Sequence, residues 1–231
     1  MSACFACGSG PVLGGVVLEP VLARVKEWLE SGRIDASLED TPWVVEESEG
    51  RLVAYNPLFI NPVVVEYDSK NSVLRLRVDT GVKAILLGVD ERLRVYHRLL
   101  LFNRDPLIKG FLEEPDDSIV LSADLTSQAL DEREFNTALA LLMIATLSLY
   151  KTLREVSEEA SRALQEEMAE ALLRLPELVR RLHERGWSRD ELVRLLSRAL
   201  SSEEAVEIVD GSLKPREEKK EEKEGLDTLY Q

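Results

Sequence analysis

The sequence predicts an α+β fold, in which helices pack on an antiparallel sheet of about five strands and a C-terminal helical extension follows. Two observations lead to this class. Runs of alternating apolar and polar residues are separated by turn signals before residue 126, and a period of two predicts strands that bury one face. After them, residues 135–153 are apolar on nearly every side, and no charge occurs between Glu134 and Lys151, which predicts a buried central helix.

The central stretch is too short and too interrupted for a membrane span. A bilayer requires about 20 predominantly apolar residues, whereas Thr137, Thr146 and Ser148 interrupt this run. We therefore expect a core helix with other elements packed around it, and no membrane association. Because one thin sheet cannot cover every face of such a helix, we also expect a homodimer.

Before the central helix, the expected elements are two helices and a series of hairpins. The first helix begins at Pro20, which needs no N–H donor at a first helical position. The second spans 90–103, with Leu93, Tyr96 and Leu100 along one face and arginines on the other. The strand signals lie at 43–47, 52–55, 63–67, 73–78, 109–113 and 118–125.

Beyond the central helix, the sequence predicts further helices and then a tail. Ser157 fits an N-cap, so a break there and a continuous helix both remain open. Pro176 is expected to begin a new helix, and Ser188 with Glu191 forms a capping box for another. The resulting division is a flexible arm over 1–17, an α+β domain over 18–155, a helical hairpin over 156–202, and a disordered charged tail with an apolar end over 203–231.

Composition favours a protein as the partner. The chain has 231 residues and a net charge of −14, so it repels nucleic acid and anionic membranes over most of its surface. A basic or apolar protein suits it better. No basic segment precedes an apolar one near the start, so we expect a cytoplasmic location. The excess of Glu and Arg over Gln, Asn, Cys and Met favours a heat-adapted source.

The stretch 99–125, LLLFNRDPLIKGFLEEPDDSIVLSADL, resembles the YbjN family and the wider type III secretion chaperone-like fold. In that pattern an apolar helix ends in Asn, a Gly-Phe strand follows, and an acidic turn leads to an alternating strand. The matching positions are Asn103, Leu107, Gly110, Phe111, Ile119, Leu121 and Leu125. The resemblance covers about 20–153 and implies a small α+β sandwich, usually a homodimer. Secretion chaperones of this fold are acidic, cytoplasmic and non-enzymatic, and they hold an extended segment of a client protein. No catalytic residues carry over.

The candidates for chemistry are few. Cys4 and Cys7 have the spacing of a zinc or redox pair, but structural zinc needs four ligands and the chain has no second cysteine pair. The only histidines, His97 and His183, lie in predicted solvated helices without a nucleophile nearby. The acidic turn 113–117 could hold a cation or do acid/base work, although such a hairpin tip is usually only solvated. We therefore predict no enzyme, no metal site and no cofactor.

The sequence thus predicts a non-enzymatic, protein-binding adaptor or chaperone-like protein that is homodimeric and holds a partner segment. The alternative is a nucleic-acid-associated regulator, in which the arginine-rich helices of 174–200 form a helix-turn-helix. We expect instead a helical hairpin whose arginines pair with the acidic surface, because the second helix offers few base-reading side chains. An apolar cluster after the charged linker resembles a tethered docking peptide. The candidate partner-binding residues are Arg181, Arg185, Trp187, Arg194, Leu226, Leu229 and Tyr230.

Overall fold

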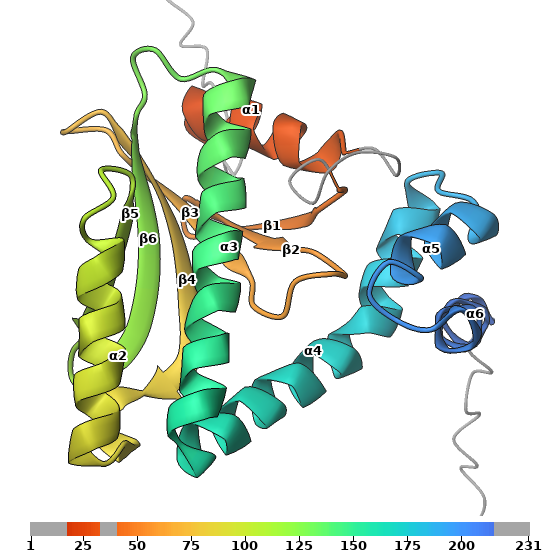
Figure 1. Cartoon of the computed structure of the whole chain (residues 1–231). Coiled ribbons are helices and arrows are strands. Elements are labelled where there is room, and N and C mark those ends of the chain that lie inside the picture. Colours follow the sequence, from red (N-terminus) through yellow and green to blue (C-terminus); the bar gives the residue numbers. More distant parts are fainter. Residues whose placement is uncertain (1–17, 33–40, 215–231) are drawn as a thin grey trace, which may run out of the picture.

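The structure, a computed structural model, describes residues 18–32 and 41–214 (Figure 1). Helix α1 (Pro20–Glu30) precedes two hairpins, β1 (Val44–Ser48) with β2 (Arg51–Tyr55) and β3 (Val63–Asp68) with β4 (Val73–Lys83). The 3-10 turn η2 (Ala84–Leu86) leads into α2 (Val89–Phe102), and β5 (Ile108–Glu113) and β6 (Ser118–Thr126) follow. The remaining elements are α3 (Glu132–Val156), α4 (Glu158–Glu184), α5 (Arg189–Leu196) and α6 (Ser202–Leu213). The predicted arm, the cysteine pair, and Leu226, Leu229 and Tyr230 lie outside the described residues.

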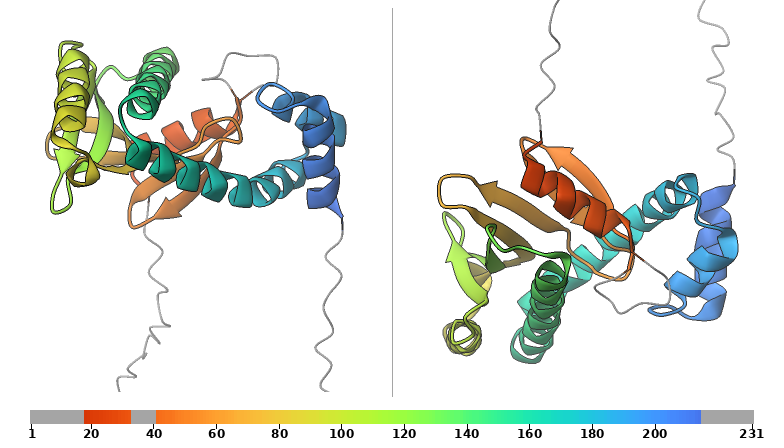
Figure 2. Two further views of the ribbon diagram at one scale, coloured as in Figure 1. Left: turned by 60° about the horizontal axis from the view of Figure 1, so that its bottom comes forward. Right: turned by 90° about the horizontal axis from the view of Figure 1, so that it is seen from above.

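The strands form one sheet in the order β1-β2-β3-β4-β6-β5, and every neighbouring pair is antiparallel. The predicted α+β class is confirmed, with six strands rather than about five. Helices α1, α2 and α3 cover one face of the sheet (Figures 1 and 2). On that face the alternating residues are fully buried, for example Leu74 and Leu76 of β4 and Leu121 of β6. The other face of the sheet carries charged side chains that form ion pairs between neighbouring strands, such as Arg75 with Asp124 at 2.8 Å.

The central helix is a core helix over most of its length. Phe135, Leu139, Leu142, Leu149 and Leu153 of α3 are fully buried against α1 and the sheet. By length and composition alone, the segment 132–155 would also suffice to cross a membrane, with a mean hydropathy of 1.3, but half of it is buried inside the structure. That burial is what a core helix requires.

Helix α4 resolves the open question of a break near Ser157 and corrects the predicted helix start at Pro176. The chain breaks at Ser157, whose side chain accepts hydrogen bonds from the backbone N–H groups of Glu159 and Ala160 as the N-cap of α4. The prediction that Pro176 begins a new helix is wrong, because α4 runs through it to Glu184. Burial on both sides of the proline, at Leu175 and Leu178, holds the helix together there despite the missing N–H.

The C-terminal helices enclose a second, smaller core. It comprises residues of α4, α5 and α6 together with Val44 of β1. These helices therefore dock on the face of the sheet that α1 does not cover, at the end formed by β1. The prediction that a tail begins at Glu203 is wrong, because 202–213 form α6. A capping box between Ser201 and Glu204 opens this helix, and Ala205 and Val209, four residues apart, are fully buried.

Candidate protein-binding surfaces

Helix α2 presents an apolar stripe to solvent. Its buried residues are Val95 and Leu99, whereas Leu93 and Leu100 are 61% and 65% exposed. The expectation that Leu93 and Leu100 lie on a buried face is therefore wrong. The helix has apolar residues on two sides. Leu99 packs against the sheet because Gly110 of β5 has no side chain there; a Cβ at 110 would lie 2.8 Å from Leu99 Cδ2. The name α2 stripe is used for the exposed Val89, Leu93 and Leu100 of α2 together with Leu86 of the preceding turn η2.

A second apolar surface begins on α3 and crosses to α4. Leu141, Ile144 and Leu147 are exposed along the side of α3 that faces away from the sheet. Leu147 shares a surface hollow with Ile60 of the β2–β3 loop and with Met168 of α4. We call these five residues the α3 strip. Exposed apolar residues that line up in this way are typical of an interaction surface.

A partly buried polar contact links the first half of α4 to the β2–β3 loop. Glu167 accepts a hydrogen bond from Asn61 Nδ2 at 3.4 Å, and the hydroxyl of Tyr150 donates to Asn61 Oδ1. The pKa of Glu167 is raised mainly by burial of its carboxyl group, and the negative charge of Glu170 raises it further. Burial also raises the pKa of Tyr150, so its phenol stays protonated and can donate. Gly81 lies against the Glu167 side chain, which allows α4 to approach β4.

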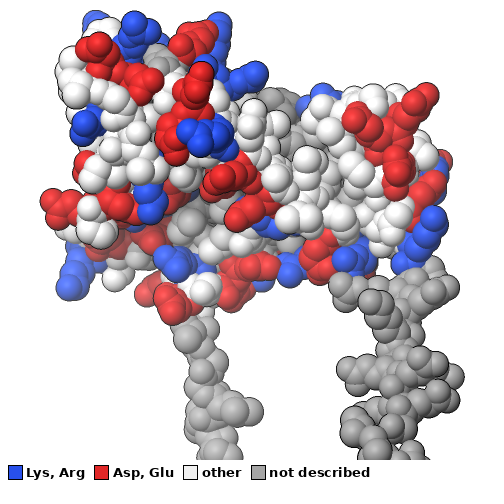
Figure 3. All heavy atoms as spheres, turned by 90° about the horizontal axis from the view of Figure 1, so that it is seen from below, with Lys and Arg blue, Asp and Glu red and all other residues white. Residues whose placement is uncertain are grey.

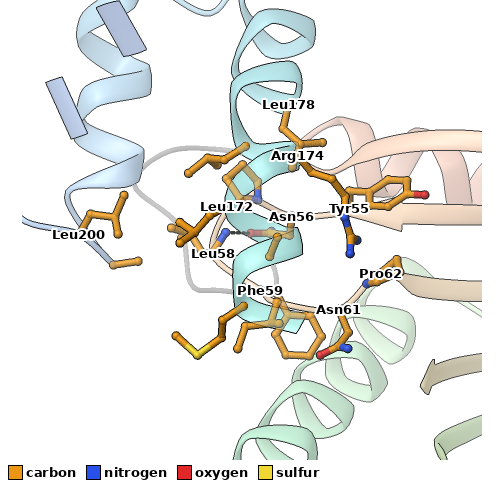
Figure 4. Close-up of a pocket in the computed structure, with 16 residues that line it drawn as sticks. Tyr55, Asn56, Leu58, Phe59, Asn61, Pro62, Leu172, Arg174, Leu178 and Leu200 are labelled. Carbon is orange, nitrogen blue, oxygen red and sulfur yellow. Dashed lines mark hydrogen bonds between the residues drawn. The ribbon is translucent and has the colours of Figure 1, made fainter. Parts of the chain in front are cut away.

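A cavity of about 260 Å³ opens between the β2–β3 loop, α4 and the turn before α6 (Figure 4). Leu58 and Leu172 line it from the loop and from α4, and Leu200 lies across from them. The main polar groups in its wall are already engaged. Asn56 holds the loop in shape, because its side chain donates to Thr41 Oγ1 at 2.6 Å and accepts from the Leu58 N–H at 2.7 Å. The cavity therefore offers mainly apolar contacts.

Figure 3, which views the molecule from below, shows acidic and basic side chains interspersed and an uncharged stretch over α4, between the two ends of the molecule. The exposed apolar residues of α4 are Met168, Leu172 and Leu173, at 46%, 54% and 81%. Since Met168 and Leu172 also line the cavity, the α3 strip and the cavity are continuous.

The residues proposed from sequence as a partner site do not converge. Arg181 pairs with Glu46 of β1 at 2.7 Å, and Arg185 bonds to Glu30 at 2.7 Å and to the carbonyl oxygen of Trp43 at 3.0 Å. Both therefore hold the C-terminal helices on the α+β part. Trp187 is half-buried against the second core, and Arg194 is exposed on α5.

Most arginines of the C-terminal helices pair with the protein's own carboxylates. Besides Arg181 and Arg185, the pairs are Arg174–Glu170, Arg180–Glu177 and Arg189–Asp210. This agrees with the expected docked hairpin and leaves few guanidinium groups for phosphates. The acidic turn is also paired: Lys83 bonds to Asp116 and holds the pKa of that carboxyl below its usual value. Within 18–32 and 41–214, no cluster of His, Cys, Asp or Glu is arranged to hold a metal ion.

The sequence already indicated that one sheet face could not cover all the apolar residues of the central helix, and the α3 strip includes the part left exposed. The surface that sequence reasoning missed is the cavity. No signal existed for the cavity, since its wall comes from three segments far apart in the chain.

An antiparallel sheet with helices packed on one face gives the chain an α+β architecture. The chain belongs to the family described as domain of unknown function DUF8183, whose model matches residues 24–153. No curated protein matches the chain.

Several solved structures have a similar arrangement. YbjN of E. coli shares 15% identity, with 58% of this chain and 93% of that one covered and a TM-score of 0.41. The HopA1–SchA chaperone–effector complex shares 13% identity, with 58% and 98% covered and a TM-score of 0.41. The Yersinia pestis type III secretion chaperone SycH, in complex with a fragment of YscM2, shares 15% identity, with 56% and 96% covered and a TM-score of 0.35. The resemblance seen in the sequence is confirmed as a likeness to these proteins, at low identity and low TM-score.

Proposed function

We propose that this is a non-enzymatic, chaperone-like protein that binds a segment of a partner protein, acts as a homodimer and resides in the cytoplasm. The α3 strip is the observation that carries the proposal. The TM-scores of the solved structures lie below 0.5, so no property is transferred from them to this chain.

The α3 strip has the shape and chemistry that suit an extended peptide. Its residues run from Leu141 through Ile144 and Leu147 of α3 to Met168 of α4, so successive side chains of a bound segment would meet successive apolar positions. Lys151 and Arg154 border the hollow beside it. An apolar centre with a charged rim is typical of a protein interface.

The α2 stripe supports the homodimer. Ile144 and the stripe residues are exposed to a similar extent, but the stripe lies on a separate helix, so one surface can take a second copy while the other takes the partner segment. In a two-fold dimer the same patch occurs on both sides of the interface, so a row of exposed apolar residues such as the α2 stripe can pair with its own copy.

Light scattering at micromolar concentration tests the dimer. The unmodified protein should have twice the mass of the chain, and Leu93→Glu combined with Leu100→Glu should have the mass of one chain. Arg94→Glu adds negative charge to the same helix outside the stripe and should leave the dimer intact. A monomeric unmodified protein would contradict this part of the proposal.

A photo-reactive amino acid at Ile144 tests the partner segment. In an extract of the source cells it should give a defined protein adduct that a second substitution, Leu147→Glu, abolishes. The same photo-reactive group at Arg94 should give none. Adducts of equal yield at both positions would show that the α3 strip is not a specific site.

The nucleic-acid alternative is not proposed, because the arginines on which it depended hold the C-terminal helices in place. Arg181 and Arg185 contact β1, α1 and the segment before β1, and Arg189 pairs with Asp210.

A further inference from the structure

The cavity beside the β2–β3 loop adjoins the α3 strip, but half of its wall comes from outside the family domain. The loop belongs to the matched region 24–153, whereas Leu172, Leu175 and Leu200 follow it in the chain. At about 260 Å³, the cavity is smaller than the roughly 300–1,000 Å³ of typical small-molecule sites. This size favours one or two side chains of a peptide over a separate small ligand.

We propose that the apolar cluster Leu226, Leu229 and Tyr230 of the same chain docks at this cavity and places one or two of its side chains inside. The three residues are spaced i, i+3 and i+4, so a single helical turn would present them on one side. They are the only large apolar side chains after Leu213. The proposal does not depend on the α3 strip binding a partner.

The end of α6 lies close enough for the cluster to reach. Ser212, Leu213 and Lys214 share a surface hollow with Pro176 and Arg180 of α4. Pro176 directly follows Leu175, which lines the cavity. The intervening residues 215–225 number eleven, and a chain of that length has a root-mean-square span of roughly 18 Å. Because α4 rises only about 1.5 Å per residue, Pro176 beside the end of α6 and Leu175 in the cavity wall are close together. The cavity therefore lies within reach of the linker from Lys214.

The tether raises the strength of a weak contact. A link of this length gives an effective concentration on the order of millimolar, so even a modest affinity fills the site. The linker contains no large apolar side chain that could compete for the cavity.

Amide hydrogen exchange on the full-length chain tests the proposal. We expect the amides of 58–61 and 171–175 to exchange about tenfold faster when Leu226, Leu229 and Tyr230 are all replaced by serine. A matched control replaces Glu221, Glu222 and Lys223 with serine, which alters the linker and keeps the cluster; its exchange should equal that of the unmodified protein.

Two further measurements separate the possible occupants. Protection that is independent of protein concentration from about 1 to about 100 micromolar supports a contact within one chain, whereas protection that rises with concentration overturns the proposal in favour of a second copy. Ala171→Trp, which fills the cavity, should abolish the difference between the serine variant and its parent. Equal exchange in the parent and the serine variant would overturn the proposal outright.

Discussion

Gly81 fixes how closely α4 packs on the sheet, and replacing it with alanine tests that contact quantitatively. Gly81 lies in a register shift of β4 with φ +69°, and its N–H donates to Asp79 Oδ1 at 2.9 Å. An L residue in the left-handed region costs about 1–2 kcal/mol. A Cβ at 81 would also lie 2.6 Å from Glu167 Cγ, so the Glu167 side chain must rotate away from Asn61.

The expected destabilisation follows from these two effects. Losing the hydrogen bond from Asn61 costs about 0.5–1.5 kcal/mol, so Gly81→Ala should lower the free energy of unfolding by about 2–3 kcal/mol. In a Glu167→Ala background the clash and the bond are both absent, and the cost should fall to about 1–2 kcal/mol. Urea unfolding followed by circular dichroism measures each value, and the difference is the coupling between the two residues.

Gly50 supplies the matched control. It also has a positive φ, +78°, but nothing lies within 4 Å of its would-be Cβ. Gly50→Ala should therefore cost about 1–2 kcal/mol whether or not Glu167 is present. If Gly81→Ala cost the same in both backgrounds, the claim that Gly81 sets the approach of α4 would be refuted.

Three other predictions concern the packing of the C-terminal helices. Because the pKa of Glu167 is raised in the folded protein, its ionisation should reduce stability as pH rises above the unfolded value of about 4.5, and Glu167→Gln should flatten that decline in urea unfolding at a series of pH values. Arg185→Ala removes the bond to the Trp43 carbonyl oxygen and a partly exposed ion pair, so it should cost about 1 kcal/mol, whereas Arg194→Ala should change stability by less than about 0.5 kcal/mol. Leu195→Ala should cost about 2–4 kcal/mol by thermal or urea unfolding, because its fully buried side chain leaves a void in the second core; a cost below about 1 kcal/mol would show that this core is loosely packed.

The sequence determined the elements whose signals are local. The apolar–polar alternation over 73–78 placed a half-buried strand, and the capping box of Ser188 and Glu191 placed a helix start that the structure has at the same position. Strand alternation and capping depend on neighbours within a few residues, so they can be read without knowing the fold.

Only the tertiary structure decided matters that depend on distant residues. Helix α2 has apolar residues on two sides, and the sheet, through the space left at Gly110, selected Val95 and Leu99 for burial over Leu93 and Leu100. Packing on both sides likewise carried α4 through Pro176. The cavity exists only because the β2–β3 loop, α4 and the turn before α6 meet in space. Local sequence patterns specify which segments form helices and strands. Which of their residues become buried depends on the distant segments that the fold packs against them.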